Sequence, residues 1–302
     1  MRRLPIALLL SCTIALLVHF LGQSSTTSSV QAADRDEAPS GFSDEDFAAH
    51  VAALKKKLPS DDFTIVIEKP FVVIGDEKPD VVKQRAINTV RWATKRLKER
   101  YFSKDPRHIL DVWLFKDKAS YEKHVAQLWN DRPTTPYGYY SSRHRALVMN
   151  ISTGGGTLVH EIVHPFIESN FPRCPAWFNE GLGSLYEQCA DRNNIITGLT
   201  NWRLAGLQKA IKAGNLPSFK DLCGSNAIAF YSRDRGTNYA QARYLCMYLQ
   251  EKDLLQKFYQ LFTEQHAKDP GGYETLKTVL KRDDMDAFQK EWEAWVMKLR
   301  FP

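Results

Sequence analysis

Two histidines and a glutamate stand close together in His160-Glu161-Ile162-Val163-His164. On a helix, residues four positions apart face the same way, so both imidazoles can reach one metal ion. The carboxylate of Glu161 then lies beside the open coordination position, where it can take a proton from a metal-bound water and pass it to a leaving amine. A metal ion also lowers the pKa of such a water and polarises the carbonyl group under attack. The spacing therefore predicts a hydrolytic metal centre with Glu161 as its general base.

The residues around this motif favour a metal centre over a helix that carries two surface histidines. Leu158, Ile162, Phe166 and their neighbours make the segment 157–170 apolar along one broad side. Such a helix is expected to be buried, and paired buried histidines need a partner because unpaired polar groups away from water are costly.

A catalytic zinc ion needs a third protein ligand. Glu168 lies one turn beyond His164, but three ligands spread over about 12 Å of a straight helix cannot meet at one ion. One class of metallopeptidases takes its third ligand from the extended motif H-E-x-x-H-x-x-G-x-x-H. Here Ile167 replaces the glycine and Asn170 replaces the last histidine, so the third ligand must come from another segment.

Glu180 is the strongest candidate for this ligand. It lies sixteen residues after His164, in a second apolar segment with a helical pattern at 176–189. A turn with Pro172 and Pro175 separates the two segments. Two helices can therefore fold back on each other and bring Glu180 to the histidines.

The motif HEIVH, a short loop and the sequence P-x-W-F-N-E-G-L-G at 175–183 together resemble the gluzincin metallopeptidases. The match looks closest to the peptidase-MA-like proteins of exported bacterial chains, and it is close over 157–188. The resemblance implies a zincin-like fold and peptide-bond hydrolysis with Glu161 as the base. It also implies one Zn²⁺ per chain, bound by His160, His164 and Glu180.

The resemblance suggests further site residues. The family often has an acid at the position of Glu187, where a bond to a ligand histidine would fix its orientation; the alternative is an ordinary acid at a helix end. Ser184 stands where some gluzincins carry an aspartate. A tyrosine or histidine on a later helix commonly donates to the oxyanion in this family, and Tyr239 is the expected donor here, with Tyr231 as the runner-up and core packing as the alternative role.

The strand expected at 145–152 precedes the metal-binding helix. In gluzincins the corresponding strand is a sheet edge on which an extended substrate lies antiparallel, held by main-chain hydrogen bonds. The resemblance therefore implies that Ala146, Val148 and Asn150 contact substrate.

Pro165 directly follows His164. Inside a helix it removes the hydrogen bond to the carbonyl of Glu161 and favours a kink. Two interpretations stay open: the helix ends early, or it continues with a kink that sets the angle of His164.

The elements that position these residues predict an α+β fold with two parts. Apolar runs indicate strands in the first part, at 61–152, which should form a small mixed β-sheet with helices. The second part, at 153–302, is mostly helical in pattern and carries HEIVH and Glu180. We expect 61–302 to form one catalytic unit, and we expect the following elements: a helix capped by Ser43 within 43–59, a strand pair or one broken strand at 63–75, a helix at 79–101, a strand at 108–115, a helix at 118–129 and a β-hairpin at 137–152.

The first 32 residues have the pattern of a targeting segment. Two arginines precede a mostly apolar run at 4–21, and small residues precede a possible cleavage site after Ala32. A cleaved signal peptide is the preferred interpretation, and an uncleaved membrane anchor is the alternative. Either one places the folded part outside the cytoplasm, as a secreted or periplasmic protein or as an anchored one. Residues 33–60 should supply a linker and the N-terminal helix.

The composition bounds the class of protein. Of 302 residues, 43% are hydrophobic and 25% are charged, which excludes a fully disordered chain or a low-complexity fibre. The net charge of +6 is mild and spread along the sequence, so nucleic acid is not an expected partner. A peptide or protein substrate is expected, and a membrane only if the leader stays uncleaved.

Four cysteines lie outside the leader, at Cys174, Cys189, Cys223 and Cys246. An exported protein permits disulfides. The expected helix between Cys174 and Cys189 would hold them about 20 Å apart, which disfavours that pair. Two other pairings, or free buried thiols, stay open.

Three functions fit the sequence. The first is a zinc metallopeptidase, either an endopeptidase or an aminopeptidase. The second is an exported non-enzymatic binding module with a structural or vestigial zinc site, which would lack an open coordination position. The third is a metal hydrolase that cleaves a different amide bond, such as one in a cell-wall peptide.

Overall fold

A mixed five-stranded β-sheet forms the N-terminal part of the structure. The computed structural model describes residues 41–133, 135–232 and 235–301, so the targeting segment lies outside the described residues. The strands are β1 (Thr64–Glu68), β2 (Phe71–Gly75), β3 (Leu110–Phe115), β4 (Gly138–Ser141) and β5 (Ala146–Asn150), in the spatial order β1-β2-β3-β5-β4. The inner strands β2, β3 and β5 are parallel, whereas β1 and β4 pair antiparallel at the two edges.

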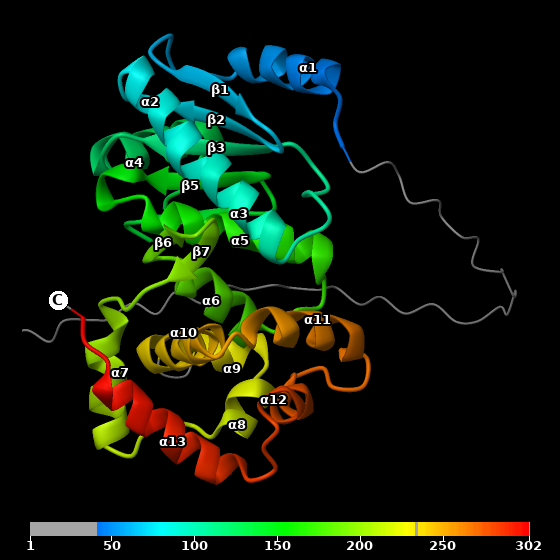
Figure 1. Ribbon diagram of the computed structural model, residues 1–302. Helices are drawn as coiled ribbons and strands as arrows, with labels where there is room; N and C mark the ends of the chain where they lie inside the picture. Colours follow the sequence, from blue (N-terminus) through cyan, green and yellow to red (C-terminus); the bar gives the residue numbers. More distant parts are fainter. Residues whose placement is uncertain (1–40, 134, 233–234, 302) are drawn as a thin grey trace, which may run out of the picture. The chain divides into compact units, whose positions relative to one another are not determined.

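Helices cover both faces of this sheet (Figure 1). One face packs against α1 (Asp44–Lys55) and α4 (Lys118–Trp129). The other packs against α5 (Gly156–Asn170) and a continuous helical stretch that consists of α2 (Pro79–Arg85), the π-helical η1 (Ala86–Arg91) and α3 (Trp92–Arg100). Strands buried on both faces read as near-continuous apolar runs, as in Phe71-Val72-Val73-Ile74, where every side chain is fully buried.

Local sequence signals explain where several elements begin. The Ser43 hydroxyl accepts from the amide of Asp46, and the Asp46 carboxylate accepts from the amide of Ser43, which completes a capping box at the start of α1. Asp117 caps α4 in the same way through the amide of Ser120. The predicted cap is confirmed, and of the two alternatives at 63–75 the strand pair is the one formed.

The C-terminal part is helical, as predicted. Its helices are α6 (Ala176–Leu185), α7 (Arg203–Lys212), α8 (Phe219–Gly224), α9 (Ala227–Ser232), α10 (Arg235–Glu251), α11 (Leu255–Gln265), α12 (Tyr273–Leu280) and α13 (Met285–Lys298). The helix α10 packs against α6, and α6 packs against α5 (Figure 1). Arg243 in α10 is fully buried and donates to the carbonyls of Ser184 and Leu185 at the end of α6. The α+β prediction with a helical C-terminal half is therefore confirmed.

A two-stranded hairpin replaces the end of the predicted helix at 176–189. The helix α6 stops at Leu185, and β6 (Cys189–Arg192) pairs with β7 (Ile195–Gly198). Asn193 and Asn194 form the two-residue turn, with φ of 53° and 64°. Asparagine tolerates this left-handed conformation, and tight hairpin turns require it, so the Asn-Asn pair was the available sequence signal.

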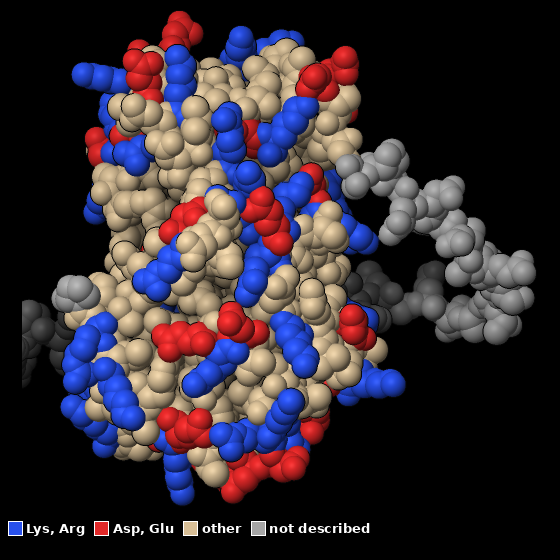
Figure 2. Space-filling model, viewed as in Figure 1, with Lys and Arg blue, Asp and Glu red and all other residues tan. Residues whose placement is uncertain are grey.

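The four cysteines outside the leader are all free thiols, and Cys223 and Cys246 are buried. Neither disulfide pairing left open by the sequence is formed. Within the described ranges, no helix is long and apolar enough to cross a membrane. Basic and acidic side chains are interspersed over the face of the molecule in Figure 2.

Candidate metal centre

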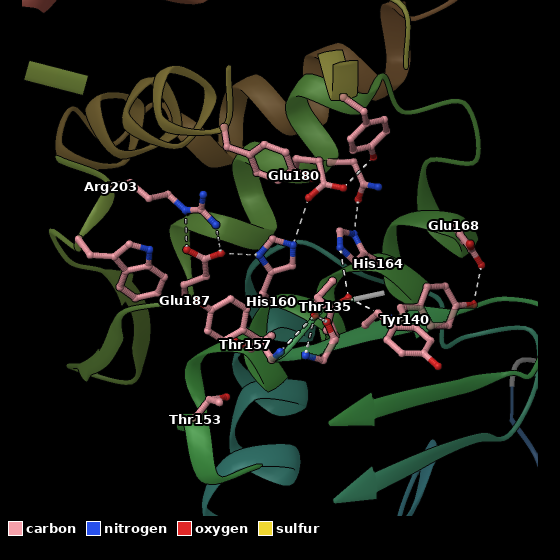
Figure 3. Close-up of a pocket in the computed structure, with 18 residues that line it drawn as sticks. Thr135, Tyr140, Thr153, Thr157, His160, His164, Glu168, Glu180, Glu187 and Arg203 are labelled. Carbon is pink, nitrogen blue, oxygen red and sulfur yellow. Dashed lines mark hydrogen bonds and ion pairs between the residues drawn. The ribbon is translucent and has the colours of Figure 1, made fainter. Parts of the chain in front are cut away.

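The three predicted ligands meet at one point. His160 and His164 lie on α5 and Glu180 lies on α6, and one donor atom from each lies within 4.8 Å of the other two (Figure 3). Nε2 of His160 is 3.2 Å from Oε2 of Glu180. Donors placed tetrahedrally at 2.0–2.1 Å from a zinc ion are about 3.3 Å apart. The spacing of His160 and Glu180 and the His–His–Glu donor set therefore fit a zinc ion.

Each histidine is oriented by a hydrogen bond at its other ring nitrogen. Nδ1 of His160 is 3.2 Å from Oε1 of Glu187, and Nδ1 of His164 is 2.9 Å from Oδ1 of Asn179. Because both partners offer oxygen acceptors, each Nδ1 is the hydrogen-bond donor, and each Nε2 is the ring nitrogen that can bind an ion. The predicted contact of Glu187 with a ligand histidine is present. Its predicted position is wrong, because Glu187 lies in the turn after α6 and not on the helix.

Glu187 is itself held by side chains that the sequence did not single out. Arg203 donates to its two carboxylate oxygens at 2.9 and 2.7 Å, and Asn201 donates to Oε2 at 3.1 Å. Burial would raise the pKa of Glu187, but the hydrogen bonds from Arg203 and His160 outweigh burial and lower it to about 2. Glu187 is therefore a carboxylate at neutral pH.

Burial and mutual charge set the protonation of the ligands. Burial would raise the pKa of Glu180, but the charge of His164 and the hydrogen bond with His160 lower it to about 2. Burial would lower the pKa of His160, but hydrogen bonds to Glu180 and Glu187 raise it well above its ordinary value. Without a cation, His160 thus takes up a proton between two carboxylates.

Glu161 lies beside the ligands and is only 8% exposed. Its Oε2 is 3.7 Å from Nε2 of His164 and accepts the amide proton of Tyr140 on β4 at 2.9 Å. Burial raises the pKa of Glu161, against the charges of the two histidines. A raised pKa brings a carboxylate closer to the value that suits a general base.

Two glycines allow the helices to approach this closely. A Cβ at Gly183 would lie 3.0 Å from the His160 ring, and a Cβ at Gly156 would lie 2.0 Å from the carbonyl oxygen of Glu187. Any larger residue at Gly183 must therefore displace the ligand His160.

The two candidate tyrosines lie on the same wall of the site. The Tyr231 hydroxyl donates to Oε1 of Glu180 at 2.7 Å. The Tyr239 ring lies 6.3 Å from the Tyr231 ring and 5.2 Å from the Arg203 guanidinium. The Tyr239 hydroxyl forms no hydrogen bond with any described residue. The structure thus links the runner-up Tyr231, and not Tyr239, to a candidate metal ligand.

These residues line a cleft of about 880 Å³. Its wall is rich in aromatic side chains, and Tyr137 and Trp202 are 55% and 53% exposed at its rim. Gly138, Tyr139 and Tyr140 of β4 form part of the same wall.

The expected substrate-binding edge is on a different strand. β5 lies between β3 and β4, so Ala146, Val148 and Asn150 have no free edge. Ala146 and Val148 pack on the sheet face opposite α5, and the Asn150 amide group donates to the carbonyl of Pro136. Their assignment to the substrate is wrong because the hairpin strand that precedes β5 takes the edge position.

Two further features of α5 are settled. The helix continues past Pro165 to Asn170, so the early end is excluded. Glu168 is not part of the donor cluster, and its Oε2 accepts the hydroxyl proton of Tyr140 at 2.9 Å.

No family model matches this sequence, and no curated protein matches it.

Proposed function

We propose that this protein is a zinc-dependent metallopeptidase of zincin-like fold, with the gluzincin ligand set His160, His164 and Glu180. The carrying observation is that the three donors lie within 4.8 Å of one another while both histidines are hydrogen-bonded at Nδ1. This arrangement presents both Nε2 atoms to one ion, with Glu161 alongside.

A zinc ion bound there would lower the pKa of a water and polarise the carbonyl group under attack. Glu161 takes the proton of the attacking water and delivers it to the leaving amine. The hydroxyl of Tyr239, which lines the cleft and has no hydrogen-bond partner among the described residues, would donate to the oxygen that gains charge. Glu187 and Asn179 hold the orientation of the two imidazole rings during this step through hydrogen bonds to Nδ1.

The edge strand β4 supports a peptide as substrate. Gly138 and Tyr140 occupy alternate positions on β4, and their main-chain groups point away from β5. In the structure, the Thr135 hydroxyl bonds to the amide and the carbonyl of Gly138, and Glu161 bonds to the amide of Tyr140. An extended peptide can take over these bonds as an added strand.

The first test is zinc content in the purified protein. The parent should hold about one zinc per chain, and Glu180→Ala should hold much less, because two histidines alone bind the ion weakly. Glu168→Gln is the matched control, since it removes a carboxylate from the same cleft but outside the cluster. Equal zinc in Glu180→Ala and the parent would exclude the proposed ligand set.

The second test concerns the base. Glu161→Gln should keep its zinc and lose peptide hydrolysis by about a hundredfold or more. Full activity in this variant would overturn the mechanism. A folded parent that refuses added zinc would favour the non-enzymatic binding module instead.

A further inference from the structure

A second cavity adjoins the catalytic cleft. It has a volume of about 470 Å³ and lies between the second half of α5, the hairpin loop 142–145 and the segment 106–108. Tyr140 and Glu168 line both this cavity and the cleft. Their hydrogen-bonded side chains therefore stand at the boundary between the two, as Figure 3 shows from the side of the cleft.

This second cavity is strongly basic. Arg107, Arg143 and Arg145 line it, and none of the three forms an ion pair with a described residue. Glu168 is the one acidic residue in its described lining, and its carboxylate is engaged by Tyr140. Burial and then the charges of Arg145 and Arg107 lower the pKa of the neighbouring His108, against the opposing charge of Glu168.

Arg145 occupies a backbone conformation that favours glycine. Its φ is 51°, in the left-handed region at the end of the hairpin loop. A side chain in this region costs about 1 kcal/mol relative to glycine, and strained residues of this kind cluster at ligand sites.

The strand β4 leads from the catalytic residues to these arginines. β4 runs from Gly138 toward Ser141, and the loop with Arg143 and Arg145 follows directly. At about 3.4 Å per residue, the loop begins about 7 Å beyond Tyr140, whose amide is bonded to Glu161. A peptide antiparallel to β4 places its N-terminal residues toward the loop.

We infer that this cavity, which we name the arginine subsite (Arg107, Arg143 and Arg145), selects substrates with an acidic side chain N-terminal to the cleaved bond. Such a carboxylate, two or three residues before that bond, would enter a cavity lined by guanidinium groups that form no ion pair with a described residue. Arginine binds carboxylates through paired, charge-assisted hydrogen bonds. This inference names the substrate class and rests on the proposed peptidase function.

The test measures binding without hydrolysis. All variants carry Glu161→Gln, and the probes are two fluorescein-labelled peptides, Ala-Glu-Ala-Glu-Ala-Phe-Ala-Ala and its counterpart with glutamine in place of glutamate. The protein with Glu161→Gln alone should bind the glutamate probe about tenfold more tightly than the glutamine probe at low salt. Arg145→Gly should reduce this preference to about threefold or less, and its unfolding temperature should stay equal or rise because glycine relieves the backbone strain.

Lys281→Gly is the matched control. Lys281 is a basic residue with φ of 54° at the end of α12, and it lines neither the cleft nor the arginine subsite. Its variant should keep the full glutamate preference. Equal binding of both probes by the parent, or an unchanged preference in Arg145→Gly, would overturn the arginine subsite.

Digestion of a random peptide library by the zinc-loaded parent separates the two proposals. Cleavage enriched in Asp or Glu on the N-terminal side supports both, and this enrichment should fall in Arg145→Gly as the binding preference does. Cleavage with no acidic preference overturns the subsite but leaves the peptidase intact. If nothing is cleaved while glutamate-selective, Arg145-dependent binding persists, the peptidase proposal fails and the carboxylate site stands.

Discussion

At the scale of single residues, the site depends on the side chains that hydrogen-bond to the candidate ligands. A bare His–His–Glu cluster would leave each imidazole free to rotate and to carry its proton on either nitrogen. Glu187 and Asn179 remove that freedom by accepting from Nδ1. Arg203 and Asn201 in turn fix Glu187, so the orientation of His160 depends on residues that lie outside both ligand helices.

Replacement of Glu187 by glutamine should weaken zinc binding by about 10–100-fold, because such supporting groups typically have effects of that size. The amide keeps the shape of the side chain but loses the charge that pairs with Arg203. Competition with a chromophoric chelator measures the affinity. Glu264→Gln, on the exposed surface of α11, is the control, and identical affinities in the two variants would show that Glu187 has no such role.

At the scale of elements, the centre depends on the close packing of α5 and α6. The His160 ring of α5 lies directly against the backbone of Gly183 in α6. Gly183→Ala places a methyl group 3.0 Å from the His160 ring, and the ring must shift from the position in which it meets Glu180. We expect a loss of zinc affinity of at least tenfold with an unchanged helical circular dichroism spectrum.

Gly206→Ala, in α7, is the matched control because its Cβ meets no atom within 4 Å. Alanine is the better helix former there, so this variant should bind zinc normally and gain about 0.5–1 kcal/mol in the free energy of unfolding. Normal zinc affinity in Gly183→Ala would show that α6 can move to accommodate the methyl group.

The elements also show what sequence reasoning reaches. His160, His164 and Glu180 could be found because they come from two adjacent helices and a local motif. Arg203 and Asn201 could not, since they reach Glu187 only after the β6–β7 hairpin turns the chain back. Strand order was missed for a different reason, because a hairpin pattern by itself does not say which of its strands is the edge. The continuous apolar run 146–149 beside the mixed Tyr-Gly-Tyr-Tyr segment was the signal that β5 is internal.

At the scale of the whole molecule, the charges of the site link stability to pH. In the metal-free protein, Glu180 and Glu187 have pKa values of about 2, below the ordinary value of 4.5. Their contribution to the free energy of unfolding is fully present above pH 4.5 and is lost as the pH falls toward 2. The pKa of His160 is raised above 6.5, so its contribution is present below pH 6.5 and is lost as the pH rises through the raised value.

The free energy of unfolding of the chelator-treated protein should therefore be highest between about pH 4.5 and 6.5. Urea unfolding at a series of pH values measures this profile. Saturation with zinc should remove the alkaline decline, since the ion takes the place of the His160 proton between the carboxylates. A metal-free profile that stays flat from pH 3 to 9 would contradict the charge arrangement described above.

The outer edge of β4 has one more consequence, which concerns solubility. An unpaired strand edge invites another copy of the same strand and so promotes aggregation. Here Thr135 satisfies both main-chain groups of Gly138, and Glu161 satisfies the amide of Tyr140. Glu161, the proposed base, and Thr135 thus occupy this edge while the cleft is empty, and a charged hairpin tip adjoins them. A peptide that binds along β4 must displace these side chains from the main chain. The same side chains protect β4 from pairing with β4 of a second copy.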